Sequence, residues 1–175
     1  MQMQRLGRRF MSSSSSRTPI VGGNWKMNSG NGLTKATVMQ LVEGLNAAPK
    51  PKAEVFLGVP FIYLESVVAA VDPVFKVAAQ NMYKEAKGAF TGEISGEMLT
   101  DLGVNYVIVG HSERRDIFGE TDDLLGAKIA KGIDLGMTVV ACCGEHKEDR
   151  EAGTTMDVLV PQLEAIVDNT KDFSK

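Results

Sequence analysis

Asn24 and Lys26 have side chains whose types and spacing are suited to holding an anion. They follow an apolar run that contains Gly22 and Gly23. Lys26 supplies a compact positive charge for a phosphate or a developing oxyanion, and the Asn24 amide can donate to a ligand or orient a neighbour. The plainer interpretation is a solvated Lys beside an Asn turn.

A second polar segment starts at His111, which follows a Gly and precedes Ser112 and Glu113. We expect Ser112 to cap a helix whose first turn contains Glu113. Because the amino end of a helix carries partial positive charge, His111 should stay neutral and could donate a hydrogen bond to a carbonyl oxygen. His111 is therefore predicted to act as an electrophile. The alternative is that His111 is an ordinary polar packing residue.

Glu113 has two interpretations. It precedes two arginines, so it could form a helical charge pair on the surface. It could instead be a carboxylate that positions Lys26.

Composition limits the class of function. The 175 residues carry 19 Lys and Arg against 22 Asp and Glu, a net charge of −3, so we expect no nucleic-acid partner. The chain has no apolar run of about eighteen residues, so no membrane span is expected. No glycine-rich nucleotide loop, Walker A loop or metal-ligand cluster occurs, so we expect no metal and no cofactor.

The two cysteines, Cys142 and Cys143, are adjacent. Neighbouring Cα atoms lie closer together than a usual disulfide requires. We therefore expect free thiols with a packing role, in a reducing compartment.

Short β-branched runs alternate with longer segments of helical period, which is typical of parallel strands joined by helices. We expect strands at 19–24, 55–59, 75–80, 106–109 and 138–143, and helices at 34–45, 61–71 and 124–135. Because the strand runs are almost continuously apolar, both faces of the sheet should be covered. Ligands of such domains bind at the carboxyl ends of the strands, where both polar segments lie.

Residues 1–17 contain four Arg, five consecutive Ser and no acidic residue. This composition is typical of a disordered leader or an organelle transit peptide, and an untargeted tail is the alternative. We expect a folded part at 18–175 and a cytoplasmic protein, with mitochondrial or plastid import as the alternative.

Residues 81–95 are long for a loop in a compact α/β domain, and such loops are usually functional or bound to a partner. Lys84 and Lys87 are poor core residues, whereas Phe90 is apolar and would be unfavourable in water. A loop that is exposed in one subunit and buried against a partner accommodates both the lysines and Phe90. The alternative is a loop that folds back on its own domain.

Six motifs, taken in order and spacing, closely resemble those of triosephosphate isomerases. The motifs are GGNWKMN (22–28), AAQN (78–81), GAFTGEIS (88–95), VIVGHSERR (107–115), CCGE (142–145) and REAGTT (150–155). The resemblance extends over 18–175. It implies an α/β chain of the TIM (β/α)₈ barrel family that interconverts dihydroxyacetone phosphate and glyceraldehyde 3-phosphate, in glycolysis and gluconeogenesis, without a cofactor.

The same resemblance implies roles for individual residues. It makes His111 the electrophile, Lys26 and Asn24 substrate-binding residues, and Glu113 the carboxylate that supports Lys26. It also implies a homodimer in which the loop 81–95 inserts into a second subunit, with Thr91 near the partner's site.

The resemblance further implies a general-base Glu in a motif similar to YEPVWAIGTGK, after a sixth strand. The 175 residues stop before such a motif and hold about five of the eight βα units. We therefore expect these residues alone to be inactive.

Two hypotheses follow. One is an isomerase recorded as a fragment, and the other is a non-catalytic binding or dimerisation module. A weaker third, a doubly wound phosphate-binding domain, requires the strand order to reverse.

Overall fold

A curled sheet of five parallel strands forms the centre of the computed structural model, which describes residues 17–28, 32–170 and 173. The strands are β1 (Ile20–Asn24), β2 (Glu54–Val59), β3 (Phe75–Ala79), β4 (Tyr106–Val109) and β5 (Thr138–Ala141). They lie side by side in chain order, and every neighbouring pair is parallel. Because the order does not reverse, the doubly wound alternative is wrong.

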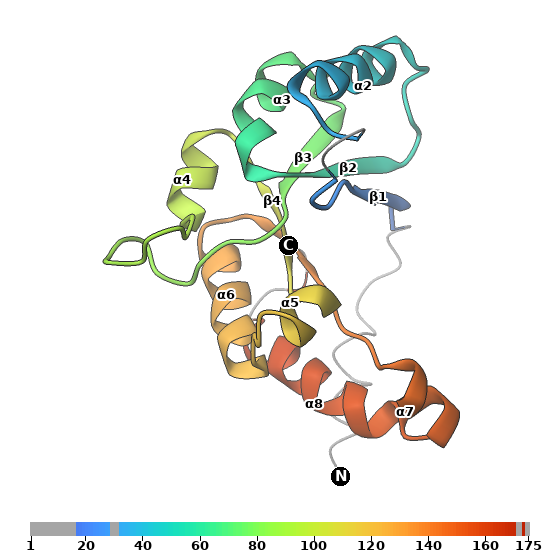
Figure 1. The fold of residues 1–175 in the computed structure, drawn as a ribbon, viewed down its shortest axis with the longest axis vertical. Coiled ribbons are helices and arrows are strands. Elements are labelled where there is room, and N and C mark those ends of the chain that lie inside the picture. Colours follow the sequence, from blue (N-terminus) through green and yellow to red (C-terminus); the bar gives the residue numbers. More distant parts are fainter. Residues whose placement is uncertain (1–16, 29–31, 171–172, 174–175) are drawn as a thin grey trace.

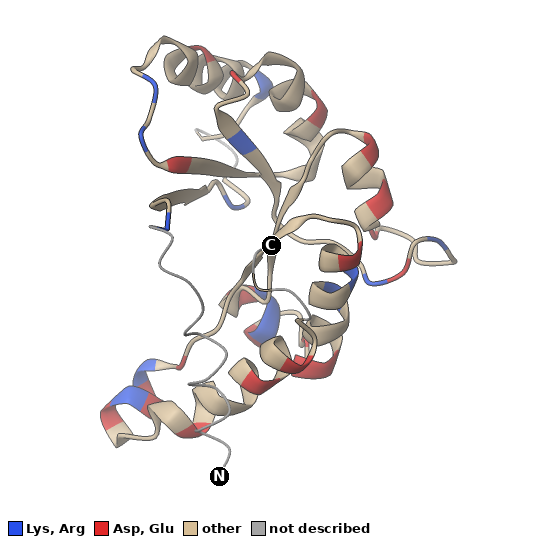
Figure 2. Cartoon of the chain, turned by 180° about the vertical axis from the view of Figure 1, so that it is seen from behind, with Lys and Arg blue, Asp and Glu red and all other residues tan. Residues whose placement is uncertain are grey.

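Helices connect the strands and cover the outside of the curled sheet (Figure 1). They are α2 (Lys35–Ala47), the 3₁₀ turn η1 (Phe61–Tyr63), α3 (Leu64–Ala70), α4 (Gly96–Asp101), α5 (Ser112–Asp116), α6 (Asp122–Asp134), α7 (Lys147–Ala152) and α8 (Thr155–Asp168). Charges of both signs lie along α6 and α7 (Figure 2). The arrangement is an incomplete (β/α)₈ barrel, as expected.

Alternation along the strands divides the core into two clusters. Leu57 and Val59 belong to the large cluster between the sheet and the helices. Phe56, which directly precedes Leu57, joins Ala78 and Ile108 in a small cluster on the inner face. This division follows from the period of two in a strand, which sends successive side chains to opposite faces.

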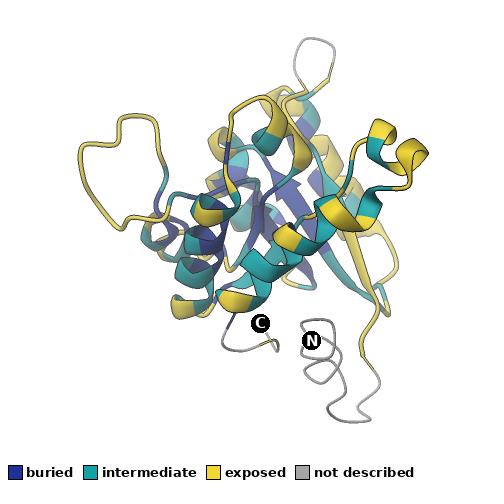
Figure 3. Cartoon of the chain, turned by 90° about the horizontal axis from the view of Figure 1, so that it is seen from below, coloured by how far each residue is buried: buried dark blue, intermediate teal, exposed yellow. Residues whose placement is uncertain are grey.

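The expectation that both faces of every strand are covered is wrong at the two edges. Ile20 and Val21 of β1 are 60% and 56% exposed, and the four residues of β5 are all half-buried. Each of these strands has a described neighbour on one side only, whereas the buried residues concentrate in the middle of the sheet (Figure 3).

Several predicted boundaries shift by one or two residues because the neighbouring strand sets where pairing stops. Ala141 of β5 pairs with the last residue of β4, Val109, so β5 ends there and not at 143. For the same reason β3 ends at Ala79, opposite the last residue of β2. The helix expected at 61–71 starts as a 3₁₀ turn, in which the Tyr63 N–H donates to the Pro60 carbonyl.

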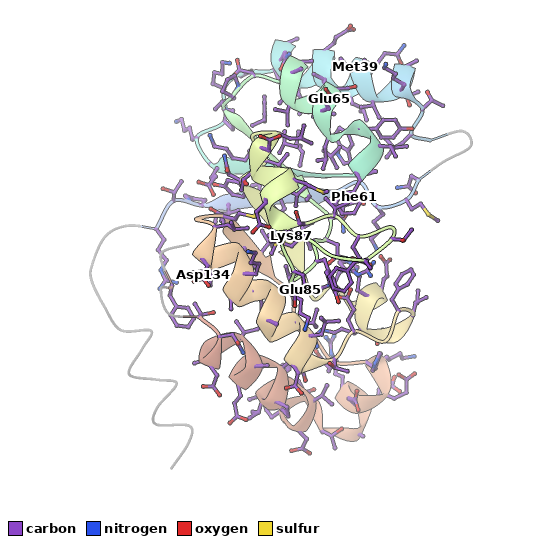
Figure 4. All side chains as sticks on the ribbon, turned by 90° about the vertical axis from the view of Figure 1, so that its left-hand side faces the viewer. Met39, Phe61, Glu65, Glu85, Lys87 and Asp134 are labelled. Carbon is purple, nitrogen blue, oxygen red and sulfur yellow. The ribbon has the colours of Figure 1, made fainter. Side chains whose placement is uncertain are left out.

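The loop 81–95 between β3 and α4 extends away from the body of the molecule (Figures 1 and 3). Residues 84–93 are all exposed, and Figure 4 labels two of them, Glu85 and Lys87. At the root of the loop the Tyr83 N–H donates to the Ile94 carbonyl, at 2.8 Å. Burial of this loop against a partner stays a prediction.

The leader expected at 1–17 lies outside the described residues, apart from Arg17. Within the described part of the chain, no helix has both the length and the apolar character needed to cross a membrane.

Candidate active site

Lys26 and Glu113 meet at the carboxyl ends of the strands, although they are 87 positions apart in the sequence. Lys26 follows β1, and Glu113 lies in the first turn of α5, just after β4. The Lys26 Nζ is 2.6 Å from the Glu113 Oε1, and both side chains are about half exposed. The two arginines that follow Glu113 pair with Glu120 and Asp122, so Glu113 does not form the helical charge pair.

Lys26 has a strained backbone, with a φ of 52°, which makes it the one non-glycine residue of the described part with a positive φ. Such a conformation costs on the order of 1–3 kcal/mol and persists only where the surroundings enforce it. The Asn24 Oδ1 accepts a hydrogen bond from the Lys26 N–H at 3.0 Å. The Asn24 side chain therefore orients Lys26.

Gln80 is a site residue that the sequence analysis did not select. Its Nε2 lies 3.1 Å from the Asn24 Oδ1, 3.3 Å from the Lys26 carbonyl oxygen and 3.1 Å from the Gly58 carbonyl oxygen. Gln80 thus holds the turn at Lys26 through the Asn24 side chain and the Lys26 backbone. Its place directly after β3, at the same end of the sheet as Asn24, was the signal that could have identified it.

His111, and not Ser112, caps α5, so the capping prediction was wrong. His111 has an extended ψ of 142° and its Nδ1 accepts from the Glu113 N–H at 3.3 Å, whereas Ser112 is already helical. With Nδ1 as the acceptor, the ring N–H that can donate to a ligand is the one on Nε2. The Glu113 Oε2 lies 3.4 Å from the same Nδ1.

Glu113 is a poor candidate for a proton acceptor. The hydrogen bond from Lys26 holds the pKa of its carboxyl below the usual value, despite partial desolvation. The carboxylate is charged at neutral pH and is already occupied by the ammonium group.

Arg115 fixes the strand ends beneath His111. Its Nε donates to the Gly110 carbonyl at 2.8 Å, and its Nη2 donates to the Cys142 carbonyl at 3.1 Å. Gly110 has a φ of 79°, and an added Cβ there would lie 3.0 Å from the same Cys142 oxygen. The turn that presents His111 therefore requires glycine.

The two cysteines are free thiols. Cys142 packs against the small inner cluster, and burial raises the pKa of its thiol. A raised pKa favours the unreactive thiol, which fits a packing role. The described residues hold no group of three or more side chains arranged to bind a metal.

Thr91 is exposed in the loop 81–95, and no hydrogen bond among the described residues joins it to Lys26 or His111. The structure thus brings together four of the five residues selected from the sequence, namely Asn24, Lys26, His111 and Glu113.

The family model described as triosephosphate isomerase matches residues 19–175. This range contains all five strands and every residue of the site described above. The chain belongs to the triosephosphate isomerase family.

Proposed function

We propose that Lys26, Asn24 and His111 form the part of a triosephosphate isomerase site that binds the substrate and polarises its carbonyl group. One observation carries this proposal. The carboxylate of Glu113 lies within 3.4 Å of both the Lys26 ammonium and the His111 ring, so a cation and a ring N–H donor lie together at the carboxyl ends of the strands.

The chemistry follows from these two groups. When a proton leaves the carbon next to the carbonyl, negative charge develops on the carbonyl oxygen, and the product is an enediolate. A hydrogen bond from the His111 Nε2–H and the charge of Lys26 both stabilise that oxygen more strongly as its charge grows. Return of the proton to the other carbon, together with transfer of the hydroxyl proton from one oxygen to the other, completes the isomerisation.

The base that removes the proton is not Glu113, because Lys26 already binds this carboxylate. We propose that the base comes from a Glu outside these 175 residues, as the family resemblance implies. General-base catalysis contributes about 10²–10⁴-fold, so the 175-residue chain alone should show no substantial turnover.

A second candidate function, dimerisation, is favoured by the loop 81–95. Ten consecutive residues, 84–93, are exposed, and Phe90 among them is 40% exposed. We propose that this loop inserts into a second copy of the chain, with Thr91 near the partner's site.

Binding of substrate can be tested without turnover. The ¹⁵N-labelled chain is titrated with dihydroxyacetone phosphate while the signals of the His111 ring and the Lys26 amide are followed. Both signals should shift in the wild type. In Lys26→Met the His111 ring and the amide of residue 26 should no longer respond to the ligand, because the substitution removes the charge. Lys147→Met is the matched control, since Lys147 is an exposed lysine on α7.

Equal shifts in the wild type and in Lys26→Met would contradict the proposed site. The absence of any shift at millimolar ligand would contradict it as well.

A further inference from the structure

Lys128 is a buried charge that the site described above does not use. It lies on α6 and is 1% exposed. Its Nζ donates to the Glu120 Oε1 at 2.6 Å and to the Asn81 Oδ1 at 3.1 Å. Burial lowers the pKa of this lysine, and the bond to Glu120 opposes that effect. A buried ammonium is costly to desolvate and needs partners of good geometry.

One of these partners leads to helix α5. The Glu120 Oε1 also accepts from the Arg114 Nε at 2.6 Å, and the Glu120 N–H donates to the Arg114 carbonyl at 3.1 Å. Arg114 directly follows Glu113, which binds Lys26. The Glu120 Oε2 is buried and has no hydrogen-bond partner among the described residues, so the Oε1 alone joins the two cations.

The other partner leads to the opposite side of the site. Asn81 directly follows Gln80, whose side chain binds the Asn24 side chain and the Lys26 carbonyl. Asn81 is also the first residue of the loop 81–95 and is itself buried. The Lys128 ammonium therefore binds the neighbour of Gln80 directly, and it reaches Arg114, the neighbour of Glu113, through Glu120.

We propose that Lys128 is a positioning residue whose buried ammonium ties the root of the loop 81–95 to helix α5. It thereby fixes Gln80 relative to the turn that carries His111 and Glu113. The inference rests on the site of the proposed function, but its test needs no substrate. Its failure would therefore be distinguishable from failure of the proposed activity.

A purely structural role would leave a different signature. A buried ion pair can often be replaced by apolar residues of similar size without loss of stability. If Lys128 only fills the core, such a replacement should leave the site unchanged. If Lys128 positions the site, the fold should survive while the site loses its geometry.

The test compares two double variants on the same helix. Lys128→Met with Glu120→Leu removes the proposed link. Lys131→Met with Glu97→Leu removes the neighbouring pair, which joins α6 to α4 and does not reach the site residues. For each chain, denaturant unfolding measures stability, and ¹⁵N NMR measures the His111 ring and the Lys26 and Gln80 amides.

The first variant should unfold cooperatively, near the wild-type midpoint or above it. The signals of its His111 ring nitrogens should shift, because the hydrogen bond from the Glu113 N–H to Nδ1 weakens, and its Lys26 amide should shift as well. The control variant should keep the wild-type signals at these positions. Unchanged site signals in the first variant, or equal changes in both variants, would overturn the proposal.

If the first double variant does not fold, Asn81→Ala tests the proposed link instead. It cuts one link and leaves the pair of Lys128 with Glu120 in place. The Gln80 and Lys26 amides should shift, and the His111 ring should stay as in the wild type. Unchanged Gln80 and Lys26 amides would overturn the proposal.

Discussion

The Lys26 ammonium and the Glu113 carboxylate form a 2.6 Å ion pair that joins the segment after β1 to the first turn of α5. Two strands, β2 and β3, lie between β1 and β4 in the sheet, and the curl of the sheet brings the two side chains together. The pair orients the charge of Lys26 and at the same time removes Glu113 from the list of candidate bases.

Lys26→Met should raise the pKa of the Glu113 carboxyl toward its usual value. The bond from Lys26 is the largest cause of the lowered pKa, and the Met side chain cannot supply it. The measurement is a pH titration of the Glu113 carboxyl carbon by NMR in both chains. An unchanged midpoint would show that the ion pair does not form in solution, and Lys147→Met serves as the control.

A second prediction concerns how the strained backbone at Lys26 affects the stability of variants at this position. Because L-residues at positive φ lack the freedom of glycine, Lys26→Gly should be more stable than Lys26→Ala by about 1 kcal/mol. Both variants lack the charge, so their difference isolates the effect of the Cβ. Denaturant unfolding measures it, and a more stable Ala variant would mean that Lys26 does not keep its φ of 52° in solution.

Acid stability should depend on Glu97. Its bond to Lys131 holds the pKa of its carboxyl below the usual value in the folded chain. The stabilisation is therefore complete above the pKa of the unfolded chain, about 4.3, and is lost as the pH falls through the lower folded value.

Glu97→Gln should accordingly be less stable than the wild type at neutral pH, and the two should converge in acid. Unfolding midpoints measured across this pH range check the prediction. Glu151→Gln, which changes an exposed carboxylate, should show the same dependence of the unfolding midpoint on pH as the wild type. A constant difference between Glu97→Gln and the wild type at every pH would contradict the account.

The loop 81–95 can be tested by its removal. Replacing residues 84–93 with a short turn should abolish the dimer and preserve the fold, because all ten residues are exposed. Sedimentation velocity measures the first effect and circular dichroism the second. A dimer that persists after the replacement would place the interface elsewhere, and a wild type that is monomeric at every concentration would contradict the proposed dimer.

Much of this fold follows from local pattern. The apolar runs predict all five strands, and the helical period predicts α2 and α6 to within two residues. The strand ends and the open edges do not follow from local pattern, because pairing stops where the neighbouring strand stops. Whether both faces of a strand are covered likewise depends on elements far away in the sequence.

Some of the site residues can likewise be selected from local sequence pattern, and others cannot. Asn24, Lys26, His111 and Glu113 can be selected by residue type and by their position after apolar runs. Gln80 also directly follows an apolar run and could have been selected in the same way. Lys128 could not, because its importance comes from the contacts of its buried ammonium with Asn81 and Glu120. A lysine in an amphipathic helix is expected to be exposed, whereas the Lys128 ammonium is buried against Glu120 and Asn81.

The most direct test of the account is a coupled isomerase assay on two chains. One is the 175-residue chain, and the other is the same chain extended by the last three βα units of a complete family member. We expect background turnover for the first chain and isomerase activity for the second, and Lys26→Met should cost the second chain several kcal/mol of transition-state binding. Turnover by the 175-residue chain within about tenfold of the extended chain would contradict it, because removal of the base should cost more than that.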